Sequence, residues 1–176
     1  CIRDRKTNDA LLKFLNDYLD LLQKPREEYE GLPTCPFIKK EYLSNKILID
    51  VFDENKESFF EKIESFEASS FTDAVFAQQI NDNMSTEDSK TYQKFLNGLL
   101  KQHFKKYKVI IVNPNDKFEV NGFNPRSHAP CLLIVVTDKK KLGKAHKQMM
   151  NSKYFTNFGD EYLKYLNVKR EQLNLK

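Results

Sequence analysis

Two runs rich in Val and Ile, at residues 107–112 and 131–137, constrain the fold of this chain more than any other feature. Continuous β-branched runs are typical of strands that are buried on both faces or lie in the middle of a sheet. Residues 46–52 form a third run, bounded by polar residues, and residues 71–80 contain a weaker fourth. We therefore expect a sheet of about four strands that helices must cover.

Amphipathic helices account for most of the remaining chain. Leu11, Leu15 and Leu19 recur at helical spacing, and Pro25 follows as a stop signal. Ser85 and Asp88 have the spacing of a capping box, which indicates the start of a long helix. Helices are expected at 8–23, 36–43, 55–67, 85–104, 137–150 and 154–166.

The order of these elements favours an α+β fold, with a four-stranded sheet and helices packed over it. Residues 7–176 are assigned to one domain, because a chain of this length can bury one sizeable core. Residues 1–6 are set aside as an added or truncated end, since the chain opens with Cys1 and several charged residues and not with Met. The connection 113–130 is long enough to be a functional loop.

Composition excludes several function classes. Five glycines and no phosphate-binding glycine motif argue against nucleotide binding through such loops. The net charge of +4 comes from 29 basic and 25 acidic residues spread along the chain, which implies only weak attraction to anions. Three widely spaced cysteines and three histidines show no metal-ligand spacing, so neither a metal nor a cofactor is expected. The cysteine usage and the lack of a long apolar run predict a soluble protein of the reducing cytoplasm, with no membrane association.

The strongest candidate for chemistry is Cys35, at the point where a loop becomes a helix. Pro36 suits the first helical position, so Thr34 or Cys35 would cap the helix and the sulfur would face free backbone N–H groups. The positive end of the helix dipole and the following cations, Lys39 and Lys40, favour a thiolate over a thiol. An unusually acidic thiol is therefore expected at this position.

The loop 113–130 carries residues that could act with such a thiol. Arg126 can fork onto a carboxylate or phosphate, and His128 can move a proton near neutral pH. If this loop meets the start of the Cys35 helix, the two segments form a pocket for a small anionic ligand. The catalytic candidates are Cys35 and His128. The ligand-binding candidates are Asn124, Arg126, Ser127, Lys39 and Lys40.

Other interpretations of the same residues stay open. Cys35 and Cys131 can be core-filling side chains, since cysteine is among the most buried residue types. The chain would then be a noncatalytic interaction module whose helices dock on a partner protein. The lysines within 139–147 could contact phosphates of a nucleic acid, but nearby acids dilute their charge and no nucleic-acid motif accompanies them, so this partner is not expected. The oligomeric state is left open.

The segment Cys35-Pro36-Phe37-Ile38-Lys39-Lys40 resembles the Cys-Pro-Phe-x-x-[Lys/Arg] helix start of monothiol glutaredoxin-like and omega-type glutathione transferase domains. This resemblance implies that Cys35 exchanges with glutathione. Pro130, directly before a predicted strand, is similar to the cis-proline of the thioredoxin fold. That fold has a strand immediately before the cysteine, whereas residues 24–30 lack strand character. The sequence from Leu32 to Phe37 also resembles a Leu-x-x-Cys-Pro-Phe motif of small uncharacterised bacterial and phage proteins, which implies no particular activity.

Overall fold

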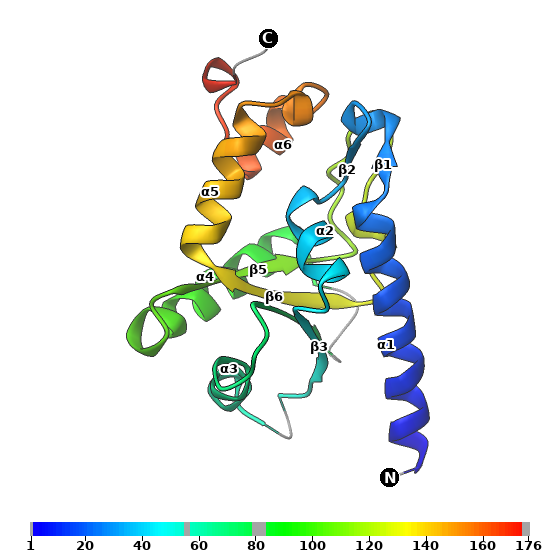
Figure 1. The fold of residues 1–176 in the computed structure, drawn as a ribbon, viewed down its shortest axis with the longest axis vertical. Coiled ribbons are helices and arrows are strands. Elements are labelled where there is room, and N and C mark those ends of the chain that lie inside the picture. The colour runs from blue at the N-terminus through cyan, green and yellow to red at the C-terminus, as the bar shows by residue number, and fades with distance from the viewer. Residues whose placement is uncertain (1, 55–56, 79–83, 174–176) are drawn as a thin grey trace.

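A mixed four-stranded sheet forms the centre of the molecule (Figure 1). The computed structural model describes residues 2–54, 57–78 and 84–173. The strands of this sheet are β3 (Ile47–Phe52), β4 (Asp73–Gln78), β5 (Tyr107–Val112) and β6 (Leu132–Asp138). Their order is β3-β4-β6-β5, with β3 parallel to β4 and the other two pairs antiparallel. The expected α+β class with a sheet of four strands is confirmed.

The two central positions of the sheet belong to β4 and β6. All six residues of β4 are buried, although its sequence carries the weakest strand signal. β5 lies at an edge, where it buries Tyr107, Val109 and Ile111 on one face and leaves Lys108 exposed on the other. The expectation of a central or doubly buried strand is therefore right for β6 and wrong for β5, because the helices cover only one face of β5 fully.

The helices predicted at 36–43, 85–104 and 137–150 begin at or within two residues of their predicted starts, whereas the helix predicted at 55–67 begins four residues later and the one predicted at 8–23 begins six residues earlier. The helices are α1 (Ile2–Gln23), α2 (Pro36–Leu43), α3 (Phe59–Glu67), α4 (Thr86–His103), α5 (Lys139–Met150) and α6 (Asp160–Tyr165). The side chains of Ser58, Ser85 and Asp138 accept hydrogen bonds from backbone N–H groups in the first turns of α3, α4 and α5. Pro36 is the first residue of α2, as its fixed φ angle favours.

The C-terminal segment differs from its predicted form. Its periodicity predicts one helix over 154–166, whereas the structure has a 3-10 turn at Lys153–Phe155 and then α6. Gly159 separates the two with an extended backbone and serves as the N-cap of α6. The apolar residues of this segment join a largely aromatic cluster that also includes Tyr29 and Val120.

Helices cover both faces of the sheet, and the alternation of buried side chains along each strand shows which helix covers which face. α3 and α4 pack against one face, where Phe66 and Leu100 meet Phe76 and Ile134. α1 and α2 pack against the opposite face, with Leu15 and Leu19 among the fully buried side chains. α5 follows β6 and lies on the same side as α2 (Figure 1). This second face carries the cavity described below.

The segment between α1 and α2 contains two short strands, the first of them within residues 24–30, which were expected to lack strand character. It forms a short hairpin of β1 (Pro25–Arg26) and β2 (Leu32–Pro33), paired antiparallel around a 3-10 turn at Glu27–Tyr29. Gly31 adopts a positive φ of 74° at the bend, a conformation that glycine accepts without strain. The hairpin returns the chain to α1 and delivers Cys35 to the start of α2.

Several predicted boundaries fall on positions that the structure does not describe. The described residues leave out Cys1, residues 55–56 of the helix predicted at 55–67 and residues 79–80 of the strand predicted at 71–80. α1 begins at Ile2, so most of the segment that was set aside as an added or truncated end is part of this helix. Among the described helices, none has both the length and the apolar character that crossing a membrane requires.

Candidate functional site

A cavity of about 530 Å3 lies between α2 and α5, above the sheet face that also carries α1. Its floor is apolar and is built from all four strands by Ile47, Val75, Ile110 and Val135. A volume of this size is typical of pockets that bury a drug-sized molecule. The cavity exists because α2 and α5 leave part of this sheet face uncovered between them.

One side of α5 forms a wall of this cavity. Leu142, Ala145 and Met149 recur at three- and four-residue spacing and face it, together with Lys141 and Lys144. The opposite wall comes from α2 and the residues before it, including Cys35, Phe37 and Ile38. This wall was not predicted from the sequence, in which the lysines within 139–147 were considered only as contacts for phosphates. The spacing of Leu142, Ala145 and Met149 among these lysines is the signal that could have revealed it.

A network of charged and hydroxyl groups forms one part of the cavity lining. Lys141 on α5 forms ion pairs with Asp73 on β4 and with Glu41 on α2, the latter at 3.0 Å. The hydroxyl of Thr137 donates a hydrogen bond of 2.6 Å to Asp73. Thr72 Oγ1 lies 2.9 Å from Glu41 Oε2 and 3.1 Å from Asp73 Oδ2. Both carboxylates are therefore compensated by neighbouring donors.

The protonation of Glu41 follows from these neighbours. Partial burial alone would raise the pKa of its carboxyl group, but the hydrogen bonds from Lys141 and Thr72 outweigh that effect and lower it. Glu41 is thus held as a carboxylate around neutral pH. Neither Glu41 nor Asp73 was among the residues that the sequence singled out, because their roles depend on helices and strands that meet only in the folded chain.

Cys35 lies at the start of α2, as predicted, but the pKa of its thiol is raised where the sequence predicted a lowered one. It is the N-cap residue, and its backbone N–H donates to the carbonyl of Leu22 at 2.9 Å. Burial raises the pKa of the thiol, and the backbone N–H groups of Phe37 and Ile38 offset only part of this effect. The expectation of an unusually acidic thiol is therefore wrong. Desolvation of the thiol by its surroundings therefore outweighs the favourable effect of the helix start on the thiolate.

Arg126 forms its ion pair and hydrogen bond with residues that do not line the cavity. Its guanidinium forms an ion pair with the fully buried carboxylate of Asp116 and donates a hydrogen bond of 2.8 Å to the hydroxyl of Tyr165. It also lies 4.9 Å from the centre of the Tyr165 ring. These contacts fix the loop 113–130 against α6. The sequence predicted that Arg126 binds an anionic ligand, but its guanidinium is already paired with the carboxylate of Asp116.

The other loop candidates also make local contacts. Asn124 accepts hydrogen bonds from the backbone N–H groups of Arg126 and Ser127 at 3.0 and 3.3 Å, and its amide donates to the carbonyl of Asp116. The Ser127 hydroxyl donates to the carbonyl of Asn124 at 2.8 Å. His128 is exposed and stacks on Phe123 with 5.3 Å between ring centres.

The structure separates the predicted site residues into two groups. Cys35 and Lys40 line the cavity, whereas Lys39 is an exposed residue of α2 that does not line it. Of the described residues around the cavity, none comes from the loop 113–130, so Asn124, Arg126, Ser127 and His128 are not brought to it. The predicted pocket between Cys35 and this loop is replaced by a cavity between Cys35, the sheet and α5.

The described residues also bear on metal binding and on the peptide bond before Pro130. No group of three or more His, Cys, Asp or Glu side chains is placed to hold a metal ion within the described part of the chain. No peptide bond between described residues is cis, so the bond before Pro130 is trans, unlike the cis-proline that the thioredoxin resemblance implies. Comparisons of the chain with protein-family models, with curated proteins and with solved structures find no match.

Proposed function

We propose that this protein binds a small, largely apolar molecule in the cavity between α2 and α5. The observation that carries the proposal is the cavity itself, which has a volume of about 530 Å3 and an apolar floor formed by the sheet. Sheet surfaces of this kind are normally covered by packed side chains, and leaving one open to solvent forfeits about 25 cal/mol for each Å2 of apolar area. A bound molecule would cover this surface and recover that free energy.

The polar groups of the cavity fit a binding site better than a gap in packing. A ligand site typically combines a mostly apolar lining with a few convergent polar groups that fix the orientation of the ligand. Here Lys141 pairs with Asp73 and Glu41, while Lys40 and Lys144 come from the two facing helices. This combination of apolar and polar lining supports a ligand that is itself apolar at one end and polar at the other.

A thiol activity at Cys35 is not part of the proposal. The raised pKa keeps the sulfur as a neutral thiol near pH 7, whereas nucleophilic or redox chemistry needs the thiolate. His128, the residue that the sequence paired with it, is an exposed residue stacked on Phe123. Cys35 therefore contributes a wall contact to the bound molecule. The cysteine usage of the sequence, three cysteines at wide spacing, supports a reducing compartment such as the cytoplasm.

An interaction module has less support from the surface. Among the residues whose side chains the structure describes, the large apolar ones that are well exposed are Phe14, Leu43 and Phe95. They belong to three helices, and α4, which carries Phe95, lies on the other face of the sheet from α1 and α2. Single exposed apolar residues of this kind are normal on a protein surface and do not define a docking patch.

Binding of N-phenyl-1-naphthylamine, a neutral apolar probe whose fluorescence rises in an apolar environment, tests the proposal. We expect saturable binding to the native chain at a single site. Ala145→Phe places a ring in the cavity and should abolish the saturable signal, while Lys147→Phe, on the exposed side of the same helix, should leave it unchanged. Circular dichroism of both variants confirms that they are folded.

Two results would overturn the proposal. One is a native chain that gives no saturable fluorescence at any probe concentration. The other is an Ala145→Phe variant that is folded and binds the probe as the native chain does, because the probe would then occupy a surface other than the cavity. Mass spectrometry of an organic extract of the purified protein provides an independent measurement, since a ligand retained through purification would appear as a small molecule that Ala145→Phe does not retain.

A further inference from the structure

We propose that the ligand of this cavity is an anionic amphiphile, whose charged group lies between Lys40 and Lys144 while its apolar body rests on the sheet. The inference rests on the proposed binding function and adds the chemical class of the ligand. It follows from the distribution of charge around the cavity. Three lysines and two carboxylates line the cavity, and they differ in whether they form ion pairs with one another.

Three of these charged groups, Lys141, Glu41 and Asp73, form ion pairs with one another. Lys141 contacts both Glu41 and Asp73, and the hydroxyls of Thr72 and Thr137 supply further donors to the two carboxylates. A ligand cation would have to compete with these donors for the same carboxylate oxygens. This part of the lining therefore gives a cationic ligand no carboxylate that lacks a partner.

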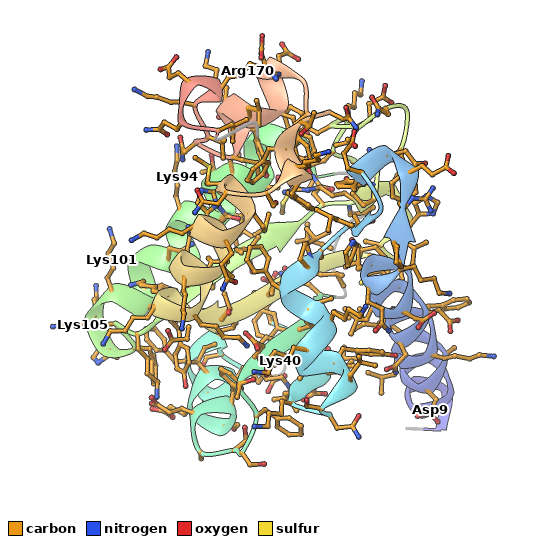
Figure 2. All side chains as sticks on the ribbon, turned by 45° about the horizontal axis from the view of Figure 1, so that its top comes forward. Asp9, Lys40, Lys94, Lys101, Lys105 and Arg170 are labelled. Atoms are coloured by element: carbon orange, nitrogen blue, oxygen red, sulfur yellow. The ribbon has the colours of Figure 1, made fainter. Side chains whose placement is uncertain are left out.

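Lys40 and Lys144 take no part in these ion pairs, although the charge of Lys40 also acts on Glu41. Lys40 on α2 and Lys144 on α5 both line the cavity, both are exposed, and neither forms an ion pair with a carboxylate of the described residues. Figure 2 labels Lys40 on α2, on the side of the sheet where α5 also lies. The two lysines come from the helices that form opposite walls of the cavity, so a single anionic group at the opening can meet both of them.

The apolar floor requires the rest of the ligand to be apolar. Ile47, Val75, Ile110 and Val135 offer no hydrogen-bonding side chain, so a fully polar anion such as free phosphate would leave this surface uncovered. A molecule with a hydrocarbon body and a terminal carboxylate, sulfate or phosphate satisfies both parts of the lining. The shared chemistry of this class is one anionic group attached to an apolar chain.

Three ligands of equal chain length separate the contributions of the apolar body and the charge. Decanoate, decanol and decylamine are compared by displacement of N-phenyl-1-naphthylamine, at concentrations below those at which they form micelles. We expect all three to displace the probe, with decanoate about three- to tenfold tighter than decanol, as two partly exposed cations would provide. Decylamine should bind no tighter than decanol.

A matched pair of double variants assigns the charge effect to particular lysines. Lys40→Gln/Lys144→Gln removes the two lysines of the opening, and Lys39→Gln/Lys147→Gln removes two exposed lysines from the same helices that do not line the cavity. Both lower the net charge by the same amount. The first should bring the affinity for decanoate down to that for decanol, and the second should preserve the difference.

The outcomes distinguish failure of this inference from failure of the proposed function. If the probe itself does not bind, the binding function fails. If the probe binds and none of the three ligands displaces it, the binding function stands and the amphiphile class is wrong. If decanol and decanoate bind equally, or decylamine binds tightest, the cavity binds apolar molecules but the anionic class is wrong. Equal loss of decanoate binding in both double variants would also overturn the inference, because the effect would then belong to the net charge and not to Lys40 and Lys144.

Discussion

Asn97 of α4 forms two hydrogen bonds with the backbone of Val109 at the edge of the sheet. Its amide donates to the Val109 carbonyl at 2.9 Å, and its side-chain oxygen accepts from the Val109 N–H at 3.0 Å. Gln93, one turn earlier on the same helix, accepts from the N–H of Ile111 at 2.7 Å. Two amide side chains thus occupy backbone groups of β5 that a further strand could otherwise bind.

Replacement of Asn97 tests whether these side chains stabilise the edge. Asn97→Ala leaves the N–H and carbonyl of Val109 without their partner, and partly buried groups of this kind cost about 1–3 kcal/mol when unpaired. We expect the free energy of unfolding, measured by urea denaturation, to fall by that amount. Lys94→Ala, at an exposed position of α4, is the control and should change it by less than about 0.5 kcal/mol. Equal stability of the two variants would show that water replaces Asn97 without cost.

Local signals in the sequence were enough to define most of the elements. Pro36 predicted the first residue of α2, and Ser85 predicted the N-cap of α4, because proline and capping side chains act on backbone groups within one turn. The edge position of β5 was not predictable in this way. A run of Val and Ile looks alike in a central and an edge strand, and the difference depends on which strands pair and on Asn97 and Gln93 of α4.

The site was less predictable than the fold because its residues are far apart in the chain. Asp73 and Lys141 are 68 positions apart, and neither has a feature that marks it as the partner of the other. The acidity of Cys35 shows the same limit. The helix start is visible in the sequence, but the burial that raises the pKa of the thiol depends on packing against elements whose placement the sequence does not show.

The ion pairs of Lys141 should make stability depend on pH in a defined direction. Lys141→Met leaves Glu41 and Asp73 as two neighbouring carboxylates, which we expect to cost about 1–3 kcal/mol at pH 7, a range reduced for the partial exposure of the lysine. The pKa of Glu41 is lower in the folded chain than in the unfolded chain. Its carboxylate therefore contributes to the free energy of unfolding above the ordinary pKa near 4.3, and this contribution is lost as pH falls through the pKa of the folded chain. The deficit of the variant should therefore shrink below about pH 4.

Urea denaturation of the native chain and Lys141→Met between pH 3.5 and 7.5 measures this dependence. Lys140→Met serves as the control, since Lys140 is the exposed neighbour of Lys141 and does not line the cavity. A deficit that stays constant over the whole range would mean that Lys141 stabilises the fold through its hydrocarbon stem and not through its charge.

The alkylation of Cys35 should report a thiol that is harder to ionise than usual. In a variant with Cys1→Ser and Cys131→Ser, Cys35 is the only cysteine left. Because burial raises the pKa of this thiol, the rate of reaction with iodoacetamide should rise with a midpoint above the ordinary value of about 8.5. The same chain unfolded in urea provides the reference. A midpoint below that of the unfolded chain would restore the acidic thiol that the sequence predicted.

The same raised pKa has a consequence for stability at alkaline pH. The unfolded chain loses the proton of Cys35 at lower pH than the folded chain does. The contribution of this thiol to the free energy of unfolding is therefore fully present below about pH 8.5 and is lost above it. Burial also raises the pKa of Tyr18 and Tyr154, which adds a further loss above about pH 10. The free energy of unfolding should fall from pH 8 to 11, and less steeply in Cys35→Ala between pH 8 and 10.

Substitution of Arg126 distinguishes a structural role of this residue from a role in binding the ligand. Arg126→Met leaves the fully buried carboxylate of Asp116 without its cation, which should lower the free energy of unfolding by about 3–5 kcal/mol. Adding Asp116→Asn removes the uncompensated charge and should restore part of that loss. We expect the double variant, once folded, to bind decanoate as the native chain does, because neither residue lines the cavity. If Arg126→Met instead kept native stability and lost decanoate binding, the guanidinium would be the anion anchor that the sequence suggested.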